Sequence, residues 1–263
     1  MIVVKRRIEI HVADGCNLHC ESCTHYSNCG HSGLLSPEEA DRQMSLWSHR
    51  LQPSLVVLLG GEPALNLNLT KIVLLARKHF PWSALKITSN GFFLHRHPEL
   101  PDAVVKSNAE IKISKHGDDD DYNTRFAPVK ELIREWTKKR ARIKIDRSTP
   151  SWTRRYFGFG ASMLPFHDED PRTSWQSCTS WKCPQLREGH LWKCPILAYL
   201  PMQKAKFPML SREWTLGLAY KPLTPEASDD EVKAWFQREE EPQCSLCPAH
   251  PPPFTRRSVL LPK

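Results

Sequence analysis

The sequence predicts an α/β protein with a parallel sheet, followed by a smaller unit of a different character. Short apolar runs alternate with helical patterns through the first half of the chain, as in repeated strand–helix units. Beyond about residue 150, prolines, tryptophans and cysteines become dense and the alternation stops. We therefore expect two domains, residues 1–165 and residues 166–263.

Strands and helices are expected to follow one another in regular order through the first domain. The strands are predicted at 1–12, 54–59, 84–88, 110–114 and 142–146, with a sixth near 163–166. The helices are predicted at 37–50, 68–80, 98–107 and 128–140, the last one after an acidic loop at 118–121. The first helix has the clearest start, with Ser36 as N-cap, Pro37 at the first helical position and Glu39 completing a capping box. Pro81 should stop the second helix.

Composition restricts the class of protein. The 263 residues are 40% hydrophobic and 25% charged, which is typical of a globular chain. No apolar run approaches the ~20 residues of a membrane span, and the amino end lacks the apolar core of a secretory signal. We expect a cytoplasmic protein that does not bind membranes. The net charge of +8 is a hint of anionic substrates, such as phosphorylated or nucleotide-linked molecules, and no nucleic-acid-binding motif is present.

Nine cysteines fall into separate groups along the chain. Disulfides are rare in the cytosol, so metal or redox chemistry is the leading explanation for so many thiols. Three of them, Cys16, Cys20 and Cys23, form a C-x3-C-x2-C pattern directly after the first strand. A [4Fe–4S] cluster is normally held by four cysteines, so a loop with three leaves one iron open to a further ligand. A zinc site or a set of buried thiols is the alternative.

Three further motifs stand where later strands end. Gly60, Gly61, Glu62 and Pro63 follow the strand at 54–59, Ser89-Asn90-Gly91 follows the strand at 84–88, and Ser114 leads into Lys115-His116-Gly117. Together with the cysteine triad, these motifs resemble the radical S-adenosylmethionine (SAM) superfamily. The resemblance implies a partial (β/α)6 TIM-like barrel, with the chemistry at the carboxyl ends of its strands. It also implies a SAM-binding [4Fe–4S] cluster, SAM itself, and an external reductant such as flavodoxin or ferredoxin.

The resemblance implies a set of SAM contacts. The backbone and Glu62 of the GGEP turn are expected to hold the methionine amino group, and the loops at Ser89, Asn90 and Ser114 to complete the site. Many members carry an aromatic residue where this chain has Ser22, so Tyr26 or His25 is expected to pack on adenine instead. Arg147, at the end of the fifth strand, either contacts the SAM carboxylate or lies in solvent. Trp152 and its neighbours either line a substrate mouth or form a surface loop.

A second cysteine group occupies the last third of the chain. Residues 183–194 form a hairpin pattern with a turn at Glu188-Gly189, and Cys244-x2-Cys247 follows a helical pattern at 229–238. Gly189-x4-Cys194 and the later CxxC resemble the twitch, or SPASM-like, extension, a small C-terminal β-hairpin-plus-helix unit that holds an auxiliary [4Fe–4S] cluster. Its four ligands come from Cys178, Cys183, Cys194, Cys244 and Cys247. Cys178 fits the family spacing, whereas Cys183 fits the hairpin geometry. A zinc ribbon is the alternative.

Two cysteines are candidates for a catalytic task. Cys29, just past the triad, and Cys183 each carry a thiol that could return a hydrogen atom to a substrate radical, as could Cys178. For Cys29 the alternative is a buried structural role.

The predicted reaction is reductive cleavage of SAM to a 5′-deoxyadenosyl radical, which then takes a hydrogen from a substrate C–H bond. We expect oxidation or epimerisation of a sugar or aminocyclitol-type small molecule. The second hypothesis is epimerisation or cross-linking of a ribosomal peptide. A hypothesis from another class is a non-catalytic iron–sulfur or zinc protein that serves as scaffold or electron carrier.

Overall fold

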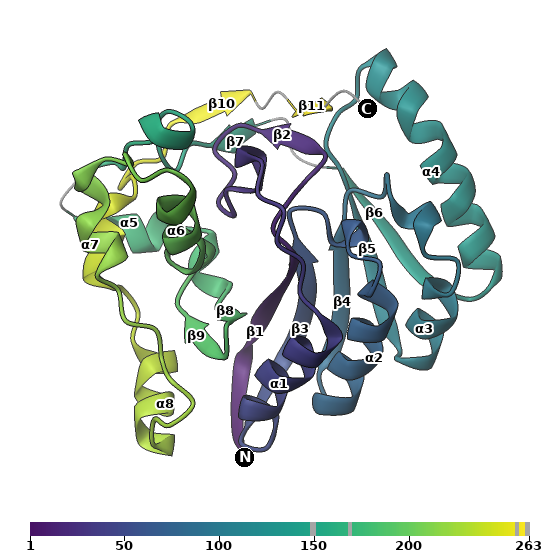
Figure 1. Ribbon diagram of the computed structural model, residues 1–263, viewed down its shortest axis with the longest axis horizontal. Coiled ribbons are helices and arrows are strands. Elements are labelled where there is room, and N and C mark those ends of the chain that lie inside the picture. Colours follow the sequence, from purple (N-terminus) through teal and green to yellow (C-terminus); the bar gives the residue numbers. More distant parts are fainter. Residues whose placement is uncertain (148–150, 168–169, 256–257, 261–263) are drawn as a thin grey trace.

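The computed structural model describes residues 1–147, 151–167, 170–255 and 258–260. Its centre is a seven-stranded sheet in the order β6-β5-β4-β3-β1-β8-β9 (Figure 1). Parallel pairing joins all neighbours from β6 to β8, and only β9 runs antiparallel to its neighbour. The strands are β1 (Ile2–Ala13), β3 (Leu51–Gly60), β4 (Ala84–Ser89), β5 (Ala109–Lys115), β6 (Arg142–Arg147), β8 (Gln185–Arg187) and β9 (His190–Trp192).

The remaining elements surround this sheet. Two short antiparallel pairs stand apart from it: β7 (Ser151–Thr153) with β10 (Pro253–Thr255), and β2 (Leu18–Cys20) with β11 (Ser258–Leu260). The helices are α1 (Pro37–Ser48), α2 (Leu69–His79), α3 (Leu100–Lys106), α4 (Asp120–Lys138), α5 (Pro171–Ser177), α6 (Pro195–Lys206), α7 (Thr215–Leu218) and α8 (Asp229–Gln237). Figure 1 shows α1 to α4 alongside β3 to β6, and α5 to α8 on the other side of β1. None of the helices in the described ranges combines the length and apolar character that a bilayer crossing requires.

The predicted parallel α/β sheet is confirmed, and five of its strands lie where the sequence placed them. The start of α1 at Pro37 with Ser36 as N-cap is confirmed, whereas its capping box and the start of α4 need correction. Ser36 caps α1 by accepting from the Glu39 N–H at 3.1 Å, but the Glu39 carboxylate turns to Arg42 and Gln43 and forms no capping box. α4 begins at Asp120, eight residues before the predicted start, because the Asp119 carboxylate accepts from the Tyr122 N–H at 2.8 Å and caps the helix.

The sixth strand predicted near 163–166 does not form. Leu164 instead makes an isolated antiparallel bridge with Phe157, and the two backbones exchange hydrogen bonds of 2.8 and 3.0 Å. Pro165 has no N–H with which to extend a ladder. The sixth parallel strand of the sheet is β8, which lies between β1 and the edge strand β9.

Two hydrophobic cores hold these elements together. The larger one lies between the sheet and its helices and includes Ile10, Leu58 and Ile113. Leu186 and Trp235 belong to it too, so residues on both sides of the predicted boundary at 165 share one core. The smaller core joins the cysteine loop to the carboxyl-terminal region; its largest buried members are Tyr26, Tyr156, Tyr199 and Trp214. The division into two domains stays a prediction.

Candidate functional site

A cavity of about 250 Å³ lies at the carboxyl ends of β1, β3, β4 and β5. Strand ends of a parallel sheet meet at one edge, so loops far apart in sequence reach the same space. The residues lining it that the sequence singled out are Cys16, Cys20, Cys23, His25, Gly60, Gly61, Ser89, Asn90, Ser114, His116 and Trp152. The structure therefore brings the cysteine triad together with three of the strand-end motifs.

The loop with the triad is fastened to the glycine turn after β3. The Gly61 N–H donates to the Ala13 carbonyl and the Glu62 N–H to the Gly15 carbonyl, both at 2.8 Å. A Cβ built on Gly61 would stand 2.1 Å from the Gly15 carbonyl oxygen. Only glycine permits this approach of two backbones.

The far side of the loop is held by side chains from distant segments. The Tyr156 hydroxyl donates to the Cys23 carbonyl and the Asn28 amide to the Cys20 carbonyl, both at 2.9 Å. Ser22, where many family members carry an aromatic residue, has a left-handed backbone with φ of 56°. Its hydroxyl accepts from the Arg155 N–H at 2.8 Å. Sequence reasoning missed Asn28, which belongs to no motif.

The three thiols are suited to a positively charged centre. Burial raises the pKa of Cys23 to about 11, with Cys20 adding to the effect. Burial and the nearby Glu62 raise the pKa of Cys16 well above its ordinary value. Three thiolates in this space need a cation to stabilise them, and an iron centre supplies one. No three His, Cys, Asp or Glu side chains in the described ranges are placed to hold a single metal ion. The fit to a cluster therefore depends on the shared cavity and the thiol chemistry.

Glu62 has a different position from the one expected. Its carboxylate is completely buried and accepts from the Ser89 hydroxyl at 2.6 Å, the Asn90 N–H at 2.7 Å and the Ala64 N–H at 3.0 Å. Burial raises its pKa to about 7 despite these donors. The side chain thus ties the turn after β3 to the loop after β4, and the backbone of Gly60 and Gly61 faces the cavity instead. Pro63 is buried beside it at the start of a 3-10 turn.

Tyr26 does not reach the cavity. Its left-handed backbone, with φ of 55°, turns the ring into the smaller core, where it packs on Tyr156 at 5.5 Å between ring centroids. His25 lines the cavity in its place, and burial lowers its pKa to about 3, so its ring is neutral. Arg147 ends β6 in register with Lys115, and its side chain lies outside the described part of the chain.

The two candidate hydrogen donors lie away from the cavity. The Cys29 thiol is buried in the smaller core and accepts from the Gln203 amide at 3.3 Å. Cys183 precedes β8; burial, together with the carboxylate of Glu9, raises the pKa of its thiol. Neither residue is among those that line the cavity.

A family model described as "Radical SAM superfamily" matches residues 10–147, more than half of the chain. The chain belongs to the radical SAM superfamily. The GTP 3′,8-cyclase of Aquifex aeolicus is 32% identical to it over 114 residues, or 41% of this chain and 34% of that protein. The probable GTP 3′,8-cyclase of Thermoplasma volcanium is 32% identical over 121 residues, or 45% and 35%. The chain thus spans about a third of the length of these relatives.

One solved structure resembles nearly the whole radical SAM chain. BtrN, crystallised with AdoMet and 2-DOIA, aligns over 94% of this chain and 94% of its own, with a TM-score of 0.50 and 14% sequence identity. At that identity the likeness concerns the fold alone.

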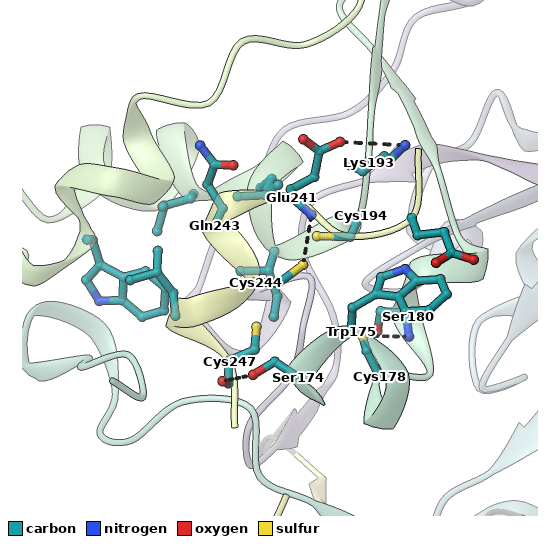
Figure 2. A pocket seen from close by; sticks show the side chains of 16 residues that line it. Ser174, Trp175, Cys178, Ser180, Lys193, Cys194, Glu241, Gln243, Cys244 and Cys247 are labelled. Atoms are coloured by element: carbon teal, nitrogen blue, oxygen red, sulfur yellow. Dashed lines mark hydrogen bonds and ion pairs between the residues drawn. The ribbon is translucent and has the colours of Figure 1, made fainter. Parts of the chain in front are cut away.

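A second cavity, of about 50 Å³, lies in the carboxyl-terminal half of this radical SAM protein. Figure 2 shows Cys178, Cys194, Cys244 and Cys247 around it, contributed by three separate segments. Cys178 follows α5, Cys194 lies between β9 and α6, and the last two cysteines belong to the turn after α8. The Ser180 N–H donates to the Cys178 sulfur at 3.2 Å and the Glu241 N–H to the Cys244 sulfur at 3.5 Å.

Cys183 is absent from the residues lining this second cavity. The hairpin β8–β9 has the predicted turn, with positive φ at Glu188 and Gly189. However, β8 pairs with β1, so the segment just before it lies beside Glu9. The structure therefore gathers Cys178 with the other three cysteines and leaves Cys183 outside.

The carboxylate of Asp14, just after β1, connects that strand to the β8–β9 hairpin. The Asp14 carboxylate bonds the Arg187 guanidinium at 3.0 Å and the His11 imidazole at 2.9 Å. Burial alone would raise the pKa of Asp14, but these two partners outweigh it and hold the pKa at about 2. Asp14 is therefore ionised throughout the neutral range.

We expect a measurable coupling between Asp14 and Arg187. In a double-mutant cycle of Asp14→Asn and Arg187→Gln, urea unfolding should give a coupling of about 1 kcal/mol, because the pair is mostly shielded from solvent. The coupling should be constant between about pH 5 and 8, since the folded and unfolded pKa values both lie below this range. A coupling indistinguishable from zero would mean that the pair does not fix the hairpin to β1.

Proposed function

We propose that this radical SAM protein is an oxidoreductase that removes hydrogen from a C–H bond of a sugar or aminocyclitol-type small molecule. Cys16, Cys20 and Cys23 hold the SAM-binding [4Fe–4S] cluster, and Cys178, Cys194, Cys244 and Cys247 hold an auxiliary one. When bound, the first cluster and SAM supply a 5′-deoxyadenosyl radical, and the second cluster supplies an acceptor for the substrate electron.

The residues of the first cavity bind and orient the reactants. Gly60 and Gly61 offer backbone close to the triad, and the Asn90 side chain donates to Asn17 at 2.7 Å, which fixes its position. The neutral ring of His25 can lie beside a sulfonium or an adenine without charge repulsion.

The single observation that carries the proposal is the gathering of Cys178, Cys194, Cys244 and Cys247 around one cavity. Four cysteines are the usual ligand set of a [4Fe–4S] cluster. Epimerisation would need a thiol beside the substrate, and the described residues lining the first cavity include no cysteine besides the triad. Oxidation is therefore favoured over epimerisation.

Anoxic reconstitution tests the proposal. Protein loaded with iron and sulfide should contain about eight irons per chain and should form 5′-deoxyadenosine from SAM with dithionite, or with flavodoxin or ferredoxin as reductant. Cys20→Ala should retain about four irons and form no 5′-deoxyadenosine, because a triad ligand is missing. Iron assays and mass spectrometry of the products give both readouts. Fully loaded wild-type protein that leaves SAM intact would contradict the proposal.

The isotope content of the product distinguishes the two outcomes that remain. In deuterated water, epimerisation by a thiol places deuterium on the substrate carbon, whereas oxidation leaves that carbon without new hydrogen. Deuterium in the product would replace oxidation by epimerisation as the function.

A further inference from the structure

One face of β4, β5 and β6, the face opposite the helices, carries charged side chains. In a parallel sheet both faces are usually apolar. In β4 and β5, Leu85, Ile87, Ile111 and Ile113 alternate with polar residues and are buried in the core on the helix side. Strands of a parallel sheet covered on both faces read as continuous apolar runs. The alternation therefore marks the second face as polar.

The strand register gathers the polar side chains of that face into rows. Lys86 stands opposite Glu110, and Glu110 opposite Arg142. Two residues further along each strand, Thr88 stands opposite Lys112, and Lys112 opposite Lys144. Cross-strand partners project to the same side, so these rows share one face.

A hollow of about 570 Å³ opens at the amino-terminal end of this face. The cations that line it are Arg77, Lys86, Arg142 and Lys144, and Glu110 is the one carboxylate among the described lining residues. Glu110 lies 3.1 Å from the Lys144 ammonium, 3.4 Å from the Lys86 ammonium and 3.9 Å from the Arg142 guanidinium. One carboxylate thus faces three of these four cations, so the described lining carries an excess of positive charge.

The polar strand residues of the hollow and the first cavity lie on the same face of the sheet. Thr88 and Ser114, which line the cavity, continue the same alternation along β4 and β5 as Lys86 and Glu110 in the hollow. Four residues separate Glu110 from Ser114, which corresponds to about 13 Å along a strand. A substrate that contacts both the hollow and the first cavity must span at least this distance.

We propose that this hollow binds the phosphate group of an elongated, phosphate-bearing substrate. The inference rests on the proposed function and adds to it the chemical class of the substrate. A phosphate group carries about two negative charges at neutral pH and three acceptor oxygens. Its charge is opposite to that of the hollow, and the donors on Lys86, Arg142 and Lys144 can reach it by leaving Glu110.

Inorganic pyrophosphate is the probe, measured by calorimetry on the reconstituted protein at low ionic strength. Lys86→Gln and Lys144→Gln should each weaken its binding about tenfold, because each removes a charge-assisted hydrogen bond. Glu110→Gln should tighten binding several-fold, because it removes the competing carboxylate. The matched control is Lys78→Gln, an exposed lysine on α2 that pairs with Asp41 away from the sheet face. This variant should bind pyrophosphate like the wild type.

Two results would overturn the inference: equal weakening by Lys78→Gln, which indicates non-specific attraction, or no tightening in Glu110→Gln protein whose thermal unfolding is normal. If Glu110→Gln fails to fold, comparison of pyrophosphate binding by Lys144→Gln and Lys78→Gln decides between the two outcomes. Both lysine side chains are exposed, so neither substitution should impair folding. The proposed function is tested separately by 5′-deoxyadenosine formation. Its failure, with specific pyrophosphate binding intact, would leave the anion site standing.

Discussion

Replacing Cys178 by alanine should remove about four irons per reconstituted chain, whereas replacing Cys183 should leave the iron content unchanged. Cys178 lines the second cavity with Cys194, Cys244 and Cys247, and Cys183 does not. Loss of one of four cysteine ligands should prevent stable assembly of the auxiliary cluster. Iron and sulfide assays on the two variants, prepared side by side, measure the difference, and each variant is the matched control of the other.

The opposite result, with iron lost only from Cys183→Ala, would exchange the two ligands and contradict the arrangement around the second cavity. Full iron in both variants would mean that no auxiliary cluster binds there. Zinc in place of iron in anoxically purified protein would replace the cluster by a zinc site. In all three cases a Cys20→Ala background, which lacks the first cluster, allows the metal content of the second site to be counted alone.

The choice between Cys178 and Cys183 shows where sequence reasoning stops. The hairpin and its turn follow from local chemistry, because Glu188-Gly189 suits a two-residue turn with positive φ at both positions. Continuing the hairpin register would place Cys183 opposite Cys194. Cys183 stays outside the second cavity because β8 pairs with β1. The paired residues are about 175 positions apart in the sequence, so no local pattern reveals this contact.

The candidate site was more predictable than its individual contacts. Strand ends of a parallel sheet converge whatever the details, so the triad, the glycine turn and the loop at Asn90 could be placed together from their order in the sequence. The direction of a side chain depends on backbone dihedral angles that the motif does not specify. Tyr26 turns into the smaller core for this reason, and Glu62 binds the loop after β4 rather than facing the cavity.

The wrong start of α4 and the strand wrongly predicted at 163–166 have a common cause: residue composition favours one structure, and a nearby hydrogen-bond partner favours another. The acidic run at 118–121 has the composition of a loop, but Asp119 accepts from a backbone N–H and starts α4 there. Residues 163–166 have the composition of a strand, but Leu164 finds its backbone partner in Phe157, only a short turn away. Both outcomes depend on which hydrogen-bond partner is nearer in the folded chain.

Gly61→Ala should both destabilise this protein and impair SAM cleavage. The new Cβ would stand 2.1 Å from the Gly15 carbonyl oxygen and 2.7 Å from the Ser27 Cβ. The first of these neighbours is backbone, which cannot rotate away, so the turn and the cysteine loop must separate. We expect a loss of about 3 kcal/mol in the free energy of unfolding. A shift of about 1 Å between the loops should reduce 5′-deoxyadenosine formation about a hundredfold.

Gly217→Ala is the matched control for this substitution. Its Cβ would approach the Leu200 Cδ2 at 2.8 Å, but that neighbour is the end of a side chain that can change rotamer. Gly217 also lies in α7, and alanine is a better helix former than glycine. The higher helix propensity therefore offsets part of the destabilisation that the contact with Leu200 causes. Urea unfolding and SAM cleavage should therefore stay close to wild type in Gly217→Ala and fall together in Gly61→Ala. Normal SAM cleavage by Gly61→Ala would show that the turn after β3 and the cysteine loop can separate without loss, and that their backbone contact is not what positions SAM beside the triad.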